Sequence, residues 1–188
     1  MVSSTVFGIE HLLDRVYASL GGFGYKVWMS YKGSVPVHPK KSNFANCLEA
    51  VKRADLFLGI ITGRYGSGKQ TGELSITHGE MLAAIQQDKL RWFLVHHDVV
   101  TARQLLRQFR RASGGWKKSF RLAENPVLDD LRIIDMYEAA IRHDLPSVTA
   151  QVIGCRTSPN LTMCFNSSRN SLVTWSESNA FFMRTAHE

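Results

Sequence analysis

Two uninterrupted apolar runs constrain the fold of this chain more than any other feature of its sequence. Residues 56–61 read LFLGII, and residues 91–95 read RWFLV, in which Arg91 precedes four consecutive apolar residues. Neither run alternates between apolar and polar residues, so both faces of each segment must be covered, as in the central strands of a parallel sheet. We therefore predict that residues 55–61 and 91–95 form adjacent, buried, parallel strands.

Segments with helical periodicity surround these two runs. Apolar residues recur at helical spacing in residues 9–20, 42–51, 77–87, 101–111 and 126–143. A short β-rich run at residues 25–29 and the first residues of the chain supply further strands. The alternation of helices and strands predicts an α/β fold, a doubly wound parallel sheet with helices on both faces.

The loops that follow parallel strands share one rim of the sheet, and ligands bind there. Three loops should meet at this rim, at residues 3–8, 62–74 and 96–99. The glycine-rich stretch Arg64-Tyr65-Gly66-Ser67-Gly68 in the second loop is therefore the first candidate for function.

Composition limits the compartment and the partners. There is no run of 18 apolar residues and no secretory pattern at the start, so we expect no membrane segment. Three isolated cysteines, Cys47, Cys155 and Cys164, are typical of a reducing compartment and indicate a cytoplasmic protein. The net charge of +7 favours partners that carry phosphate.

This charge is unevenly distributed. Residues 105–121 contain six basic and no acidic residues: Arg107, Arg110, Arg111, Lys117, Lys118 and Arg121. Six acidic residues follow in residues 124–144. We interpret the two blocks as solvated surfaces that neutralise one another. Aromatic residues that could stack on bases are scattered here, at Phe109, Trp116 and Phe120, so we do not expect a nucleic-acid partner.

Periodicity ends near residue 145, so we predict one domain at residues 1–145 and a poorly specified tail at residues 146–188 that adds no strand to the sheet. A frameshift is one hypothesis for this tail. If residues 150–156 are encoded as GCA CAG GTA ATT GGG TGC AGA, the frame that starts at the third base encodes Thr-Gly-Asn-Trp-Val-Gln, similar to the continuation in relatives of this kind.

Four motifs carry a resemblance to a known family: VSST at residues 2–5, DLFLGII at 55–61, RYGS at 64–67, and SIT at 75–77 followed by Glu80. In this order and spacing they resemble a family of bacterial TIR-like domains of unknown function, over about residues 2–145. The resemblance implies a flavodoxin-like (TIR-like) fold, and a first strand that is shorter here than in the family. The wider superfamily includes TIR domains that cleave NAD and nucleoside deoxyribosyltransferases, which both break an N-glycosidic bond with a glutamate near the start of a helix.

The resemblance assigns that catalytic role to Glu80. A fixed carboxylate can stabilise the positive charge that develops on the ribose as the bond breaks. A structural alternative remains open, because Thr77-His78-Gly79-Glu80 also fits a capping box in which Glu80 only accepts from the amide of Thr77.

The remaining site residues are candidates for substrate binding, each with a structural alternative. Arg64, Tyr65, Gly66 and Ser67 could bind a phosphate and a ribose or base, or form a simple glycine-rich turn. Ser3, Ser4 and Thr5 could contact ligand or cap the following helix. Two further candidates from the SIT motif are Ser75 and Thr77. His96-His97-Asp98 does not predict a metal site, because adjacent side chains of a strand point in opposite directions.

Three functions remain open at this point. The first is a nucleotide N-glycosidase that cleaves NAD as its substrate, in bacterial defence or signalling, with no cofactor. The second is a non-catalytic module that binds a nucleotide or a partner and acts through self-association. The third is deoxyribosyl transfer, which usually needs a second acid, and Glu73 is the nearest one in the sequence.

Overall fold

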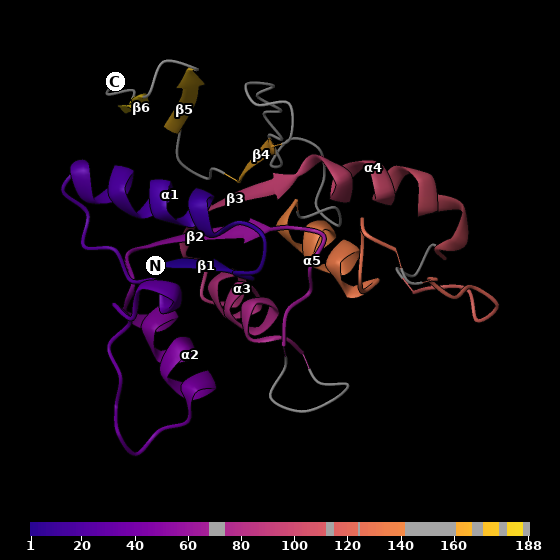
Figure 1. Ribbon diagram of the computed structural model, residues 1–188, viewed down its shortest axis with the longest axis horizontal. Coiled ribbons are helices and arrows are strands. Elements are labelled where there is room, and N and C mark those ends of the chain that lie inside the picture. The colour runs from indigo at the N-terminus through magenta and orange to yellow at the C-terminus, as the bar shows by residue number, and fades with distance from the viewer. Residues whose placement is uncertain are drawn as a thin grey trace.

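The computed structural model describes residues 1–67, 74–111, 115–123 and 125–141, together with the backbone of three strands between residues 161 and 185. The described part is a mixed α/β fold, shown in Figure 1.

A sheet of four strands in the order β1-β2-β3-β4 forms the centre of the molecule. β1 (Val2–Ser4), β2 (Leu56–Ile61) and β3 (Leu90–His96) are parallel, with Val2 opposite Leu58 and Leu58 opposite Trp92. The prediction of two adjacent buried parallel strands is confirmed.

The fourth strand corrects our prediction for the tail. β4 (Leu161–Asn166) pairs with β3 in the antiparallel direction, so residues after 145 do add a strand to the sheet. β5 (Ser171–Ser176) and β6 (Ala180–Thr185) form a separate antiparallel pair. In the sequence we overlooked three β-rich runs in residues 161–185. Each contains polar residues and none alternates regularly, so they match neither the continuous apolar pattern nor the alternating pattern of a strand. Residues 146–160 lie outside the described residues.

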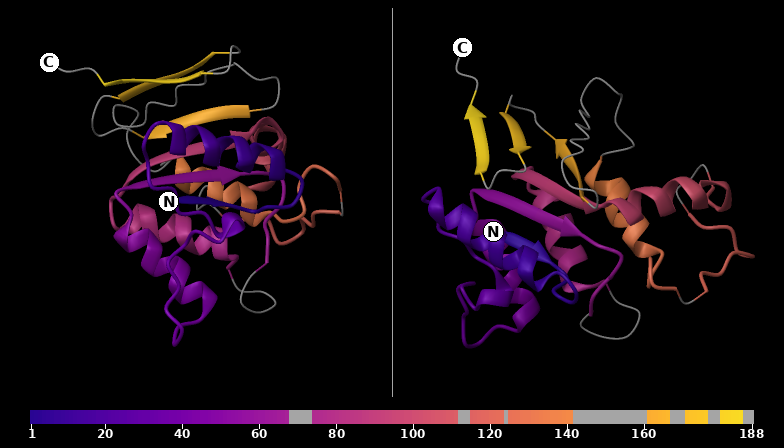
Figure 2. Two further views of the ribbon diagram at one scale, coloured as in Figure 1. Left: turned by 60° about the vertical axis from the view of Figure 1, so that its left-hand side comes forward. Right: turned by 45° about the horizontal axis from the view of Figure 1, so that its top comes forward.

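Helices cover both faces of the sheet (Figure 2). α1 (Glu10–Gly22) packs on one face. α3 (Ile76–Gln86), α4 (His97–Leu106) and α5 (Arg132–Ala140) pack on the other, and α2 (Asn43–Arg53) lies against α3. Two short 3₁₀ helices, η1 (Ser30–Lys32) and η2 (Arg107–Phe109), complete the described elements.

The side chains of β2 divide between two apolar layers because successive residues of a strand point to opposite faces. Phe57 and Ile61 join the layer beneath α3, α4 and α5, whereas Leu58 and Ile60 join the layer beneath α1. Gly59 faces the Phe93 ring, where a Cβ atom would lie 2.6 Å from Cδ1 of that ring. The covered faces explain why β2 has no polar residue.

The β-rich run at residues 25–29 forms only a single bridge and not a full strand. Met29 is bridged in parallel to Val2, whose amide donates to the carbonyl of Trp28 at 2.8 Å. Because Val2 also pairs with Leu58, β1 lies between this segment and β2. The three-residue strand β1 therefore lies inside the sheet and not at its edge.

Two helices have other limits than their periodicity predicts. α4 begins at His97 and not near residue 101, because the imidazole of His96 accepts a hydrogen bond from the amide of Asp98 and caps the helix. α5 begins at Arg132 and not near residue 126. The side chain of Asn125 accepts from the amide of Leu128, and that of Asp130 from the amide of Arg132, so turns replace the first helical residues.

Candidate functional site

A cavity of about 530 Å³ lies where the chain leaves β1 and β2, at the carboxyl ends of the parallel strands. The residues after β1, those after Met29, those after Tyr65 and the first turn of α3 contribute to its wall. The polar residues that line it are Ser3, Ser4, Thr5, Ser30, Asn43, Asn46, Cys47, Ser67, Thr77 and Glu80. The cavity occupies the position at which parallel α/β sheets bind ligands.

Glu80 is the acidic residue among the described residues that line this cavity. It lies in the second turn of α3, and its side chain is 3% exposed. The hydroxyl of Ser3, at the centre of β1, donates a hydrogen bond to its Oε2 atom. Its Oε1 atom is buried and has no hydrogen-bond partner. One carboxylate oxygen is thus fixed by Ser3, whereas the other is buried beside the Cys47 thiol without a hydrogen bond of ordinary geometry.

Burial raises the pKa of the Glu80 carboxyl above its usual range, because the charged form loses its hydration. Hydrogen bonds from Ser3 and from the thiol of Cys47 lower this pKa by smaller amounts, since they stabilise the carboxylate. The balance is typical of groups at functional sites, although buried structural carboxyls show it as well.

The helix α3 is capped by Ser75, whose Oγ accepts from the amide of His78 at 3.2 Å. The alternative of a capping box that begins at Thr77 is therefore wrong, because Thr77 lies inside the helix and Glu80 accepts a hydrogen bond from Ser3. Ser75 and Thr77 can both cap a helix, and their positions in the sequence do not show which of them begins α3.

Cys47, on α2, is a thiol in the wall of the same cavity and is 8% exposed. Burial and the neighbouring Glu80 carboxylate raise the pKa of the thiol to about 11. The group is therefore protonated at neutral pH, and its Sγ lies 3.7 Å from the hydroxyl of Ser30.

The structure brings most of the predicted site residues together. Seven of the ten line the cavity: Ser3, Ser4, Thr5, Gly66, Ser67, Thr77 and Glu80. Gly66 has a φ of +80°, and a Cβ atom there would lie 2.8 Å from Oγ1 of Thr5. Glycine thus meets both demands of this turn, the backbone conformation and the close approach to β1.

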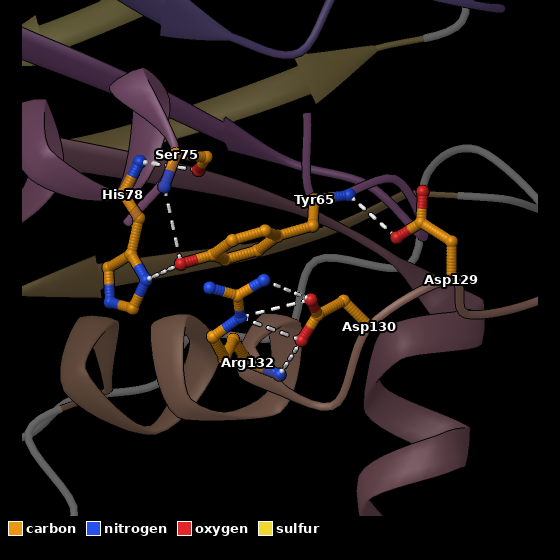
Figure 3. Close-up of polar contacts among 6 residues, drawn as sticks. All are labelled: Tyr65, Ser75, His78, Asp129, Asp130 and Arg132. Carbon is orange, nitrogen blue, oxygen red and sulfur yellow. Dashed lines mark hydrogen bonds and ion pairs between the residues drawn. The ribbon is translucent and has the colours of Figure 1, made fainter. Parts of the chain in front are cut away.

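Tyr65 and Ser75 do not reach the cavity but belong to a buried network behind it (Figure 3). The Tyr65 hydroxyl contacts Nδ1 of His78 at 2.8 Å and accepts from the amide of Ser75 at 3.4 Å. The guanidinium of Arg132 lies 4.1 Å from the centre of the Tyr65 ring. The network ties the loop after β2 to the start of α3, the helix that carries Glu80.

Two carboxylates complete this network from the loop before α5. Asp129 accepts a hydrogen bond from the amide of Tyr65 at 2.8 Å, and Asp130 pairs with Arg132. Burial lowers the pKa of His78, so its imidazole is held in the neutral form.

Arg64 lies in a different hollow from Glu80. A groove of about 640 Å³ is lined by Arg64, Leu122, Ala123, Asn125, Pro126 and Asp129, and it shares no lining residue with the Glu80 cavity.

Sequence reasoning missed the contribution of the chain after Met29 and of α2. Ser30, Tyr31 and Val35 line the cavity because the run at residues 25–29 ends at the same rim as β1. The place of this run next to β1 could have been used to predict that the residues after it reach the site. No sequence pattern indicates a role for Asn46, which is buried and holds the preceding loop through the amide and carbonyl of His38.

Gly79, next to Glu80, is explained by packing. A Cβ atom there would lie 2.9 Å from the ring of Phe44 on α2, so glycine allows α2 and α3 to approach closely. This approach also places Cys47 and Asn46 beside the cavity.

Within the described residues there is no cluster of three or more His, Cys, Asp or Glu that could hold a metal ion. The described helices include none that is both long and apolar enough to cross a membrane. The predicted rim loop at residues 96–99 does not line the cavity.

Residues 1–145 match the model of a family described as a domain of unknown function, DUF4062. The chain belongs to the DUF4062 family. Neither a curated protein nor a solved structure matches the chain. The DUF4062 region contains β1 to β3, α1 to α5 and the Glu80 cavity, so the candidate site lies wholly within the family domain.

Proposed function

We propose that this DUF4062 domain is a nucleotide N-glycosidase with Glu80 as its catalytic carboxylate, acting on NAD or a related nucleotide in bacterial defence or signalling. The observation that carries the proposal is the Glu80 side chain, which is buried at the rim of the sheet with one oxygen held by Ser3 and the other without a partner. A TIR-like, flavodoxin-like fold is part of the same proposal.

The order of the parallel segments supports that fold. Counted along the chain, the segment at residues 25–29 is the second, and it lies beside β1 on the edge opposite β2. The resulting order, 2-1-3-4, matches four positions of the flavodoxin-like order 2-1-3-4-5, and the antiparallel β4 lies next to the fourth. In flavodoxin-like sheets ligands bind where the order reverses beside the first strand. Ser3, Ser4 and Thr5 follow or end that strand in this chain.

One carboxylate is sufficient for the proposed chemistry. Nicotinamide leaves the ribose of NAD as a neutral molecule from its pyridinium form, so no acid has to protonate the leaving group. Glu80 then has to stabilise the cation that develops on the ribose, and a desolvated carboxylate interacts strongly with such a charge. Water adds to the anomeric carbon of this cation and releases one proton to solvent, which completes the hydrolysis. Glu80 must be ionised for this role, so activity should rise with pH through its raised pKa.

The hypothesis of deoxyribosyl transfer requires a second acid, for which Glu73 is the candidate, and Glu73 lies outside the described residues. A non-catalytic nucleotide-binding module remains the alternative. It predicts that the cavity binds ligand and that no product is released.

Incubation with NAD and with a panel of deoxynucleosides, followed by mass spectrometry of the products, tests the proposal. We expect nicotinamide release by the native protein, and a loss of about 100-fold or more in Glu80→Gln, since the substitution keeps size and removes the charge. Glu49→Gln is the matched control, because Glu49 is a half-exposed acid on the neighbouring helix α2 and pairs with Lys41. Equal release by Glu80→Gln and the native protein would rule out the proposed mechanism. Ligand binding without release would favour the non-catalytic module.

A further inference from the structure

A second feature of the molecule lies outside the Glu80 cavity. The described residues 107–111 and 115–121, here called the basic hairpin, follow the end of α4 and lie away from the sheet (Figure 1). Arg110 and Trp116 form an antiparallel bridge, and the amide of Lys117 donates to the carbonyl of Phe109 at 2.9 Å. Residues 112–114 lie outside the described residues.

Three aromatic side chains that are scattered in the sequence come together in this hairpin. Phe109 stacks on Phe120 with 4.5 Å between ring centres, and Trp116 stacks on Phe120 at 5.6 Å. The Arg110 guanidinium lies 4.6 Å from the centre of the Trp116 ring. Because the rings pack on one another, they hold the two sides of the hairpin together.

Ion pairs neutralise only part of the basic block. Arg110 is nearly buried and pairs with Asp135 at 2.6 Å and with Glu138 at 2.5 Å, both on α5. The other five basic side chains are exposed, and within the described residues no salt bridge involves any of them: Arg107, Arg111, Lys117, Lys118 and Arg121. Our interpretation that the basic and acidic blocks neutralise one another is therefore correct for Arg110. The other five cations of the basic block remain on one projecting element.

Leu122 and Ala123, which follow the hairpin directly, form one side of the groove that contains Arg64. Asp129 also lines this groove, and its carboxylate keeps its negative charge while it accepts from the amide of Tyr65. The charges of Arg64 and Asp129 offset one another, so the groove is not part of the basic surface.

We propose that the basic hairpin binds the phosphate backbone of a nucleic acid without regard to its sequence. Five exposed cations on one projecting element match the closely spaced charges of such a backbone, and their binding gains from the release of counterions. The proposal rests on these charges and includes no contacts to bases. This surface is independent of the N-glycosidase proposal, since no residue of the hairpin lines the Glu80 cavity.

Fluorescence anisotropy with labelled oligonucleotides, single-stranded and duplex, provides the test. If five cations contact phosphates, the slope of log K against log salt for duplex DNA should approach about −4.5. Binding should then weaken at least about 100-fold between about 50 mM and about 200 mM salt. Duplexes of unrelated sequence should bind equally.

Lys117→Gln/Lys118→Gln removes two of the proposed contacts, so it should weaken binding and reduce the magnitude of the slope by about 2. Lys26→Gln/Lys40→Gln is the control, because it removes the same amount of charge at exposed positions outside the hairpin. Lys26 lies three residues before Met29, and Lys40 lies in the loop before α2. The proposal is overturned if both double variants lower affinity equally, since that would be an effect of net charge alone. It is also overturned if the native protein binds no oligonucleotide in low salt but sediments with phosphatidylserine–phosphatidylcholine vesicles.

Discussion

The hydroxyl of Ser3 donates a hydrogen bond to Oε2 of Glu80, 77 positions further along the chain. The bond joins the first strand of the sheet to the helix α3, and it leaves Oε1 of Glu80 buried without a partner. The acidity of Glu80 therefore depends on a residue from another element.

Ser3→Ala should raise the pKa of Glu80 further, because burial already raises it and the Ser3 hydrogen bond is one of the interactions that hold it down. The acid limb of any Glu80-dependent activity should move to higher pH. The side-chain carboxyl shift of Glu80 in an NMR titration measures the same change without activity. Ser4→Ala is the control, since Ser4 lines the same cavity but donates to the carbonyl of Thr5. An unchanged titration in Ser3→Ala would contradict the expectation.

Glu80→Gln should stabilise the domain at neutral pH. The pKa of Glu80 is raised on folding, so between its unfolded and folded pKa values the folded state binds more protons, and the free energy of unfolding falls as pH rises through this window. Glu80→Gln has no ionisable carboxyl, so it avoids this loss of unfolding free energy, which is on the order of 1 kcal/mol for each unit by which folding raises the pKa. Denaturant unfolding at neutral and at acidic pH should show a gain that disappears below the window. If Glu80→Gln were less stable than the native protein at neutral pH, the ionised carboxylate would contribute favourably to the free energy of folding, and the prediction would be wrong.

Cys47 should react slowly with iodoacetamide at pH 8. Its pKa of about 11 leaves only about one thiol in a thousand as thiolate at that pH, and the side chain is nearly buried. Peptide mass spectrometry follows this cysteine separately from Cys155 and Cys164. A ligand in the Glu80 cavity should slow the reaction further, because Cys47 is part of the wall. Rapid labelling that ligand does not affect would place the thiol outside the occupied cavity.

Tyr65→Phe should lower the free energy of unfolding by about 1–3 kcal/mol, as expected when a buried polar group loses its partner. The substitution leaves Nδ1 of His78 without the hydroxyl but keeps the ring that Arg132 contacts. Tyr31→Phe, at an exposed tyrosine, should stay within about 0.5 kcal/mol of the native protein. Similar losses in both variants would mean that the buried network contributes nothing of its own.

Gly59→Ala should lower the free energy of unfolding by about 1–3 kcal/mol, because the new methyl group would overlap the Phe93 ring at the centre of the sheet. Gly21→Ala is the matched control in open space near the end of α1. It should stabilise the domain by up to about 1 kcal/mol through helix propensity. Thermal or denaturant unfolding measures both, and a neutral Gly59→Ala would show that Phe93 can move aside.

The elements near β2 illustrate what sequence could and could not specify. The apolar run at residues 56–61 predicts its own burial on both faces, because every position demands apolar cover. The N-terminus of α3 was misplaced from Ser75 to Thr77, because both residues can cap a helix and only the backbone conformation chooses between them. β4 was missed because an edge strand is selected by the open edge of β3, which lies about seventy positions away in the chain.

By itself the sequence determined the local features: buried strands, helix periodicity, a glycine-rich loop after β2, and a block of basic residues. Tertiary structure alone decided which of these share a site. It placed Glu80 against Ser3, moved Arg64 to a separate groove, buried Tyr65 behind α3, and gathered Phe109, Trp116 and Phe120 into one stack. The physical reason is that periodicity follows from neighbours within a few residues, whereas hydrogen bonding and burial of a side chain depend on which distant elements pack beside it.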